Sequence, residues 1–400
     1  MSDEPVTGVQ SILPEGTQPT PMLPKGLKRV PSGVDQLATE HLILNVGPQH
    51  PSTHGVLHML VELDGEEVIA AEADIGFLHR GIEKLAESRR YHQMGTILDR
   101  ADYVSGFHTE TAFALATEKL AEIEVPRKAS WIRSLVMELN RCASHYVWLG
   151  PVGMDAGAMA PFLYLMRERE MILDVLEAIS GSRMMFNYVR PGGVVRDLPA
   201  GIDAPLRAWL AIADKYLGET EDLLGGNEIF RARMKGVGVI APETALAFGM
   251  SGACLRSSGI DFDLRKARPY CAYGEIDFDV PLGTVGDAFD RYKVRVEEIH
   301  QSVRIVRQLL DGMPEGEHTS KVAKALRPPA GEVYAAVESP RGELGIHLIS
   351  DGGPTPYRLR LRSPAYYNLG VADELLAGGL IADMIVSLGS LDIVLGEIDR

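Results

Sequence analysis

The sequence predicts an α+β protein, mainly α, and two kinds of hydrophobic periodicity carry this prediction. Short runs in which apolar and polar residues alternate lie near both ends of the chain, a period typical of strands. Between them lie long segments in which apolar residues recur three and four positions apart, the period of helices. With 46% hydrophobic residues over 400 positions, the chain has ample apolar surface for a buried core.

The N-terminal part divides into an arm and a small antiparallel sheet. Residues 1–40 contain six of the 24 prolines and show no periodicity, so we expect an extended or disordered arm. Residues 41–75 are expected to form a β subdomain of three strands. Its signs are an apolar run over 42–46, the alternation of Leu57, Met59, Val61 and Leu63, an Asp64-Gly65 turn and a return strand over 68–73.

The central region, residues 76–312, is expected to be a helical bundle. One apolar face runs through residues 127–149, directly after Pro126, which suits a helix start. A second helix is predicted from near Pro161 to Gly181, a natural C-terminal cap. A third spans residues 289–310 over about three heptads, a length that favours a bundle over a free coiled coil.

Residues 313–400 are expected to form a C-terminal α/β subdomain. Tyr357, Leu359 and Leu361 alternate with arginines, which predicts a strand after a turn at residues 351–353. The most apolar segment, residues 377–396, contains Asp383 and Asp392. Each would cost about 2.5–3.5 kcal/mol near a bilayer centre, so we interpret this segment as buried core.

Composition excludes several classes of function. The formal net charge of −15 argues against nucleic acid as a partner. The three cysteines show no C-x-x-C spacing, so this chain alone cannot hold a four-cysteine iron–sulfur cluster or a structural zinc, and no metal site is predicted. A disulfide framework is not expected either, and the first ten residues have no features of a secretory signal.

Histidines concentrate in one segment, because seven of the eleven lie between His41 and His108. In GPQHPSTHGVLH they recur every four residues, the spacing of a zinc site on a helix. Proline and glycine interrupt this segment, which favours a rigid loop that directs one or two imidazoles into a cleft. A hydrogen-bonded structural role remains the alternative for any single histidine.

Two further groups of polar residues stand out. Arg80 follows His79, and the DRADY segment contains Arg100 and Tyr103, although such residue types are also typical of a solvated surface. Asp155 is the only charged residue among Gly, Ala, Met and Pro in GPVGMDAGAMAPF. A carboxylate in apolar surroundings is paired or neutral, and histidine is the obvious partner because such a pair can store and pass a proton.

Several long motifs, taken in order, resemble the D-type subunit family of NADH-quinone oxidoreductase, the large hydrogenase-like subunit of respiratory complex I. The resemblance covers about residues 42–400. It rests on these segments: GPQHPSTHGVL, IGFLHRGIEKLAE, DRADY, the Asp155 region with RERE, YVRPGG, LRSSGIDFDLRK and SLGSLDIVLGEIDR.

The resemblance implies the fold of nickel–iron hydrogenase large subunits, which bind their metals through two C-x-x-C pairs. The counterpart of the first pair falls at Asp102 and Ser105, and the second is replaced within SLDIVLGEIDR. The resemblance therefore implies a cavity for an organic substrate, a quinone headgroup, in place of the metals.

The resemblance also implies roles for five residues. His54 and Tyr103 match positions that contact the quinone carbonyls, and both can donate protons in a two-electron, two-proton reduction. Asp155 matches the carboxylate that partners His54. Arg80 and Arg100 match arginines next to a 4Fe-4S cluster held by the neighbouring B-type subunit, where positive charge would favour the reduced cluster.

In such a complex this chain would bind no cofactor alone, since NAD and FMN belong to other subunits. The implied partners are the B-type, C-type and I-type subunits and the H-type subunit of the membrane arm, coupled to proton pumping. The implied location is peripheral, on the cytoplasmic side of the inner cell membrane. The alternatives are a related complex with a ferredoxin-like donor, a non-catalytic scaffold, a stand-alone hydrogenase or a zinc hydrolase; the last two lack the necessary ligands.

Two departures from the family are visible. Many relatives have a histidine just before YVRPGG, linked to a pH-dependent cluster potential, whereas residues 183–187 here contain none. The stretch over residues 312–331 is also shorter than in many members, so we expect one helical segment to be missing there.

Overall fold

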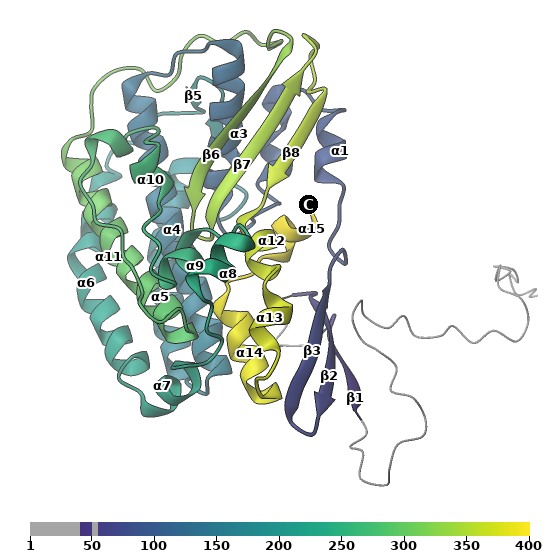
Figure 1. The fold of residues 1–400 in the computed structure, drawn as a ribbon. Helices are drawn as coiled ribbons and strands as arrows, with labels where there is room; N and C mark the ends of the chain where they lie inside the picture. Colours follow the sequence, from purple (N-terminus) through teal and green to yellow (C-terminus); the bar gives the residue numbers. More distant parts are fainter. Residues whose placement is uncertain (1–40, 50–54) are drawn as a thin grey trace, which may run out of the picture. The chain divides into compact units, whose positions relative to one another are not determined.

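The structure is a computed structural model and describes residues 41–49 and 55–400. The arm predicted for residues 1–40, and His54 with its loop, lie outside these residues. Within the described part, helices dominate and strands form small antiparallel sheets, which confirms the α+β, mainly α prediction (Figure 1).

The first sheet has the order β1-β2-β3, formed by β1 (Leu42–Val46), β2 (His58–Asp64) and β3 (Glu67–Asp74). The predicted hairpin is confirmed: Asp64 pairs with Glu67 around the turn, and Gly65 has a positive φ of 63° that suits it. Alternate residues of β2 face a core because the side chains of a strand point in turn to its two sides. The buried set in β2 is Met59, Val61 and Leu63, and Leu57 directly before the strand is also buried.

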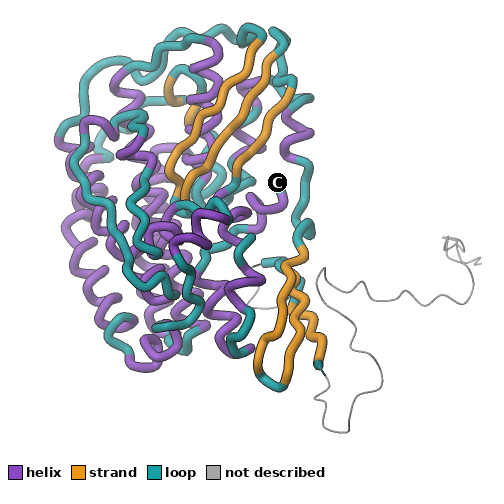
Figure 2. Tube along the Cα trace, in the orientation of Figure 1, coloured by secondary structure: helices purple, strands orange, loops and turns teal. Residues whose placement is uncertain are grey.

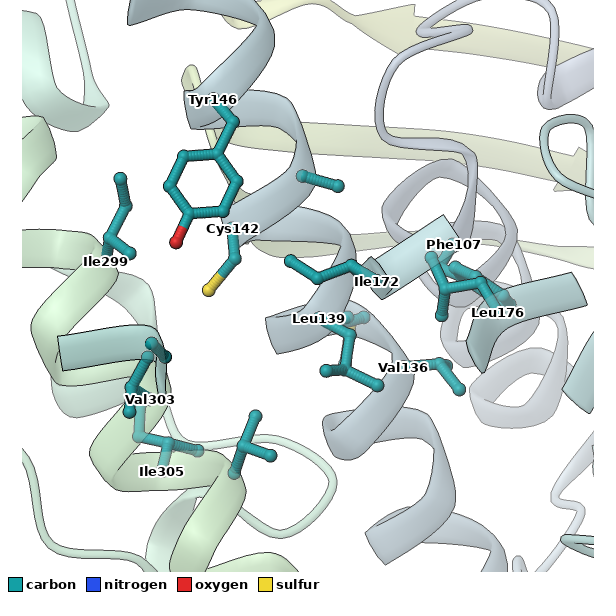
Figure 3. Close-up of a cluster of buried hydrophobic side chains, with 14 of the residues drawn as sticks. Phe107, Val136, Leu139, Cys142, Tyr146, Ile172, Leu176, Ile299, Val303 and Ile305 are labelled. Atoms are coloured by element: carbon teal, nitrogen blue, oxygen red, sulfur yellow. The ribbon is translucent and has the colours of Figure 1, made fainter. Parts of the chain in front are cut away.

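The central bundle is built around α4 (Arg127–Asp155), which contacts α5 (Ala160–Ser180) and α11 (Ala288–Asp311). The helix α6 (Asp203–Leu224) packs on both of these neighbours. Figure 3 shows part of the core, where Leu139, Cys142 and Tyr146 of α4 lie near Ile299 and Val303 of α11. The predicted helices near residues 161–181 and 289–310 are confirmed.

The helix predicted to end near Leu149 continues to Asp155, so the sequence-based end was wrong by six residues. Pro151 lies inside α4, where a proline removes one backbone donor and its ring crowds the carbonyl group four residues earlier. Gly150 allows the ring of Phe162 to pack closely, because a Cβ at Gly150 would lie 2.8 Å from it. Because α4 continues past Pro151, its last residue is Asp155.

The remaining helices are short and connect these units. Before the bundle lie α1 (Ile82–Ala86), α2 (Gly95–Leu98) and α3 (Gly106–Ala121), with a short 3-10 turn at Tyr91–Gln93. Between α6 and α11 the chain forms α7 (Glu228–Met234), α8 (Pro242–Ala247), α9 (Gly252–Ser257) and α10 (Leu264–Ala267), with a second 3-10 turn at Tyr273–Glu275. A two-stranded ribbon pairs β4 (Val189–Arg190) with β5 (Gly193–Val194).

The C-terminal sheet has the order β6-β7-β8, from β6 (Gly331–Ser339), β7 (Gly342–Ser350) and β8 (Arg358–Arg362). It packs on α3, and α1 contacts β8 (Figure 1). Leu359 and Leu361 are fully buried, as the alternation predicted. Figure 2 shows the link from α11 to β6 as loop, and residues 313–330 contain no helix.

The chain ends in α12 (Pro364–Leu369), α13 (Ala372–Leu376), α14 (Ile381–Ser390) and α15 (Leu395–Asp399). Within residues 377–396, Val386, Leu388 and Leu391 are buried, which confirms the interpretation of this segment as core. In the part of the chain that the structure describes, no helix is both long enough and apolar enough to span a membrane. The division at residues 75 and 312 stays a prediction.

A network of buried ion pairs ties the bundle to the C-terminal sheet. Arg256 of α9 donates to Glu298 of α11 at 2.5 Å and to Glu338 of β6 at 2.7 Å. Arg141 of α4 donates to the carbonyl of Glu338 at 2.5 Å. These charges are almost fully buried, and removing one partner of such a pair costs about 3–5 kcal/mol. The network therefore fixes the end of β6, which leads into the functional site.

Candidate functional site

Three segments that are far apart in the sequence meet around Tyr103. They are the loop between α2 and α3 (residues 99–105), the turn between β6 and β7 (residues 339–342) and the C-terminal segment (residues 391–399). Tyr103 is half-buried, and the ring packs against Gly396. Burial raises the pKa of Tyr103, while Arg341 acts in the opposite direction. The hydroxyl therefore stays protonated at neutral pH, available as a hydrogen-bond donor.

Asp102 and Ser105, the positions that match the first cysteine pair, lie side by side and are fully buried. The Ser105 hydroxyl donates to the Asp102 carboxylate, and the Ser105 backbone N–H donates to the same group at 3.2 Å. Arg341 donates to both oxygens of Asp102 at 3.0 and 3.2 Å. A guanidinium thus lies against the residue pair that the resemblance equates with metal ligands.

Arg341 also contacts the C-terminal segment and α4. Its Nη2 lies 3.5 Å from the carboxylate of Asp392 and donates to the Ser144 hydroxyl at 3.0 Å. Glu397 is fully buried, and its pKa is raised well above the ordinary value by burial and by the Asp102 carboxylate. Asp102, Arg341, Asp392 and Glu397 form one group, here called the carboxylate–arginine cluster. This cluster favours the protonated form of Glu397, and Arg341 lies against the two aspartates.

Backbone packing fixes the turn that carries Arg341. Gly252 has a positive φ of 67°, and a Cβ there would lie 2.4 Å from the carbonyl oxygen of Arg341. A Cβ at Gly342 would likewise lie 2.6 Å from the backbone nitrogen of Gly252. Asn368 completes the contact by donating to the Arg341 carbonyl at 3.1 Å. Only glycine permits so close an approach, so the backbone of the turn at Arg341 is held in place.

Arg80 and Arg100 lie together on the exposed side of the same region. Nη2 of Arg80 donates to the Arg100 carbonyl at 2.6 Å and to the Gly396 carbonyl at 3.3 Å, and the Arg100 guanidinium donates to the Thr96 carbonyl. Both arginines are exposed, and neither pairs with a carboxylate among the residues that the structure describes. They line a cavity of about 390 Å³ together with Ile82, Leu85, Thr96 and Ile97.

The C-terminal helix is bound to the segment that carries Arg80. The Asp399 carboxylate accepts hydrogen bonds from the backbone N–H groups of Gly76 at 2.9 Å and Leu78 at 2.6 Å. The ring of His79 is hydrogen-bonded to the Asp399 carbonyl at 2.7 Å. These bonds cross more than 300 positions of sequence, so Arg80 depends on the C-terminus for its position.

The sequence-predicted residues divide into two groups in the structure. Arg80, Arg100 and Tyr103 are brought together, whereas Asp155 lies at the end of α4, half-buried. Ser144, which contacts Arg341, precedes Asp155 by eleven residues, a separation of about 16 Å along the helix axis. His54 lies outside the described residues, so its pairing with Asp155 stays a prediction.

Sequence reasoning missed Arg341 and the role of Glu397. An arginine in a turn between strands has no periodic signal, and its partners lie far away in sequence. Asp392 and Glu397, by contrast, interrupt an apolar run, and a charged group in such a run predicts a buried partner. Across residues 41–49 and 55–400, no group of three or more His, Cys, Asp or Glu side chains is arranged to hold a metal ion.

Substitution of Gly396 by alanine is expected to disturb this site directly. A Cβ there would lie 2.6 Å from the Ala101 carbonyl oxygen and 3.1 Å from the Tyr103 ring, so we expect a loss of about 1–3 kcal/mol in unfolding free energy. Chemical denaturation of the assembled protein measures this loss of unfolding free energy. Gly218→Ala on α6 is the control, because no atom lies within 4 Å of its Cβ. Equal stability of both variants would contradict the close packing.

Comparison with known proteins agrees with the motifs. The family model described as "Respiratory-chain NADH dehydrogenase, 49 Kd subunit" matches residues 155–328 and 318–400. The chain is 46% identical over 364 residues to the D 2 subunit of NADH-quinone oxidoreductase from Solibacter usitatus, which covers 91% of this chain and 98% of that protein. It is 47% identical to the D-type subunits of Carboxydothermus hydrogenoformans and Bacillus anthracis, each covering 91% of this chain and 100% of the relative.

These matches place the chain among the subunits of respiratory-chain NADH dehydrogenases. Within that class it belongs to the 49 Kd subunit family, which corresponds to the D-type subunits of NADH-quinone oxidoreductase named above. The resemblance predicted from the motifs is therefore confirmed.

Proposed function

We propose that this chain is a core peripheral-arm subunit of a proton-translocating NADH:quinone oxidoreductase, and that it forms the quinone-reduction cavity with the B-type subunit. Quinone takes up two electrons and two protons there, so that both carbonyl groups become hydroxyl groups. The observation that carries the proposal is the convergence of three distant segments on one protonated tyrosine, Tyr103, beside a buried guanidinium.

Tyr103 suits the role of a hydrogen-bond donor to a quinone carbonyl. As electrons reach the quinone, the carbonyl oxygen gains negative charge and becomes a stronger acceptor, so the hydrogen bond strengthens as the reaction proceeds. Arg341 lowers the pKa of the tyrosine, opposite to the effect of burial, and so stabilises negative charge on the tyrosine oxygen when its proton leaves. Tyr103 is then reprotonated from solvent or from neighbouring groups.

The second proton would come from His54, with Asp155 as the partner of its imidazole. A carboxylate beside an imidazole favours the charged ring and thereby sets its pKa near neutrality. Loss of that proton would leave the charge of Asp155 less compensated, a local change that is able to bias a conformational switch and couple the reaction to proton pumping.

Arg80 and Arg100 fit a position beside the 4Fe-4S cluster of the B-type subunit. Two exposed guanidinium groups without a carboxylate partner among the described residues line a cavity with apolar walls. Positive charge on this face favours a reduced, more negative cluster. Electrons would reach the quinone from the cluster held by the B-type subunit, and this chain would contribute the positive charge of Arg80 and Arg100 and the quinone site.

The same proposal assigns partners and location. The B-type, C-type and I-type subunits and the H-type subunit of the membrane arm would surround this chain, with NAD and FMN bound in other subunits. It would lie peripherally on the cytoplasmic side of the inner cell membrane, as part of an oxidoreductase complex that is active only when assembled.

The replacement Asp155→Asn tests the proton route. Loss of the carboxylate would lower the pKa of a partner imidazole, so we expect quinone reductase turnover to fall about tenfold or more at neutral pH. Turnover and proton pumping are measured in membranes that contain the assembled complex. The control is Asp174→Asn on α5, which changes an exposed aspartate. Wild-type turnover together with wild-type pumping in Asp155→Asn would refute the pairing.

A further inference from the structure

Two buried carboxyl groups lie next to each other behind the exposed surface that carries Arg80 and Arg100, here called the arginine face. Asp99 caps the C-terminal end of α2, Glu110 belongs to α3, and neither side chain is more than 1% exposed. The Asp99 carboxylate lies close enough to Glu110 to raise the pKa of that carboxyl group. Neither group is used in the reaction proposed above.

Consecutive backbone amides of one segment hold both carboxyl groups in place. The Asn187 N–H donates to Oδ2 of Asp99 at 2.8 Å. The N–H groups of Tyr188 and Val189 donate to Oε2 of Glu110 at 3.0 and 2.6 Å. Because these amides are neighbours in the chain, the two carboxyl groups are fixed side by side.

The remaining oxygen of Asp99, Oδ1, receives no hydrogen bond from the described protein groups and is buried. A Cβ at Gly106 would lie 3.2 Å from this Asp99 oxygen, and the same Cβ would also contact the Phe186 ring. Two ionised carboxylates in contact in such surroundings repel each other strongly. One proton between them removes the repulsion and makes a hydrogen bond between the two groups.

Among the described residues, no cation donates to the pair directly. The positive charges of Arg100 and Arg190 lower the pKa of Asp99, but the two guanidinium groups donate to the carbonyl groups of Thr96 and His92. The charged groups of the neighbouring elements are engaged elsewhere. On α4, Arg133 pairs with Glu118, and Glu138 pairs with Arg265; on β6, Glu338 pairs with Arg256.

We propose that Asp99 and Glu110 share one proton and form a proton-binding site directly behind Arg100. Burial raises the pKa of both groups, that of Asp99 to about 6, and the Asp99 carboxylate raises the pKa of Glu110 further, so the shared proton is held at pH values above the ordinary carboxyl range. Its departure adds one negative charge behind the arginine face. If the proposed function holds, the potential of a cluster beside Arg80 and Arg100 then depends on pH.

Infrared spectroscopy of the assembled complex tests the proton directly. We expect the C=O stretch of a protonated buried carboxyl group, shifted in D₂O, which persists above the ordinary carboxyl range and disappears as the pH is raised further. Glu110→Gln and Asp99→Asn should each remove this pH-dependent band. Glu122→Gln, which changes an exposed residue at the end of α3, should leave it intact. A wild-type complex without the band, or a band that survives both substitutions, would overturn the proposal.

The predicted effect on the potential of the cluster is measured separately. Redox titration of the 4Fe-4S cluster at several pH values should show a pH-dependent potential in the wild type and a smaller dependence in Glu110→Gln. Equal dependence in both would contradict the link to the arginine face. The infrared band does not depend on quinone reduction, so a failure of this site and a failure of the proposed function are distinguishable.

Discussion

The variant Tyr103→Phe is expected to lose most quinone reductase activity, by roughly 10²-fold or more, while the complex still assembles. Only one oxygen atom is removed, and the ring that packs against Gly396 is retained. The loss follows because the quinone carbonyl would lose the hydrogen bond that strengthens during reduction. Turnover with a short-chain quinone, normalised to the amount of assembled complex, is the measurement.

Tyr146→Phe is the matched control for this experiment. Tyr146 is buried in the core between α4 and α11, away from the three segments of the site (Figure 3). It also loses a hydroxyl, so a general effect of removing a buried oxygen would be visible in both variants. A fall in activity that is equal in the two, or unchanged turnover in Tyr103→Phe, would remove Tyr103 from the reaction.

The variant Arg341→Ala is expected to lose about 3–5 kcal/mol of stability, because it leaves buried carboxylates without their cation. Arg341 is fully buried and contacts both Asp102 and Asp392. Denaturant unfolding of the assembled protein at neutral pH measures this loss.

Arg307→Ala provides the comparison for Arg341. Arg307 pairs with Asp214 at a half-exposed position, where an ion pair contributes about 0–1 kcal/mol. Arg341→Lys should retain part of the stability, since it keeps the charge but loses the planar fork whose two nitrogens contact Asp102 on one side and Asp392 and Ser144 on the other. If Arg341→Ala were no less stable than Arg307→Ala, the guanidinium would not be the cation that holds the carboxylate–arginine cluster together.

Much of the fold could be predicted because its elements carry a local period. The alternation in β2 and the heptads of α11 are properties of neighbouring residues, and both elements formed as expected. The end of α4 could not be predicted in this way. Pro151 reads as a helix end in sequence, but packing of α5 against Gly150 supports the helix beyond it.

The candidate site was predictable in part. Tyr103, Arg80 and Arg100 were found through motifs, and the structure brings them together. The cation of the cluster, Arg341, comes from a turn more than 230 positions after Asp102, and no local pattern links the two. The Asp99–Glu110 pair also escaped notice, because two carboxylates in a polar segment are typical of a solvated surface until their burial is known.

The most direct test of the central claim is a structure of the assembled complex with a short-chain quinone bound. The account predicts a headgroup carbonyl oxygen within hydrogen-bond distance of the Tyr103 hydroxyl, about 2.6–3.2 Å. The headgroup should lie between the loop of residues 99–105, the turn of residues 339–342 and the C-terminal segment. A headgroup bound elsewhere, with the Tyr103 hydroxyl in contact with protein alone, would contradict it.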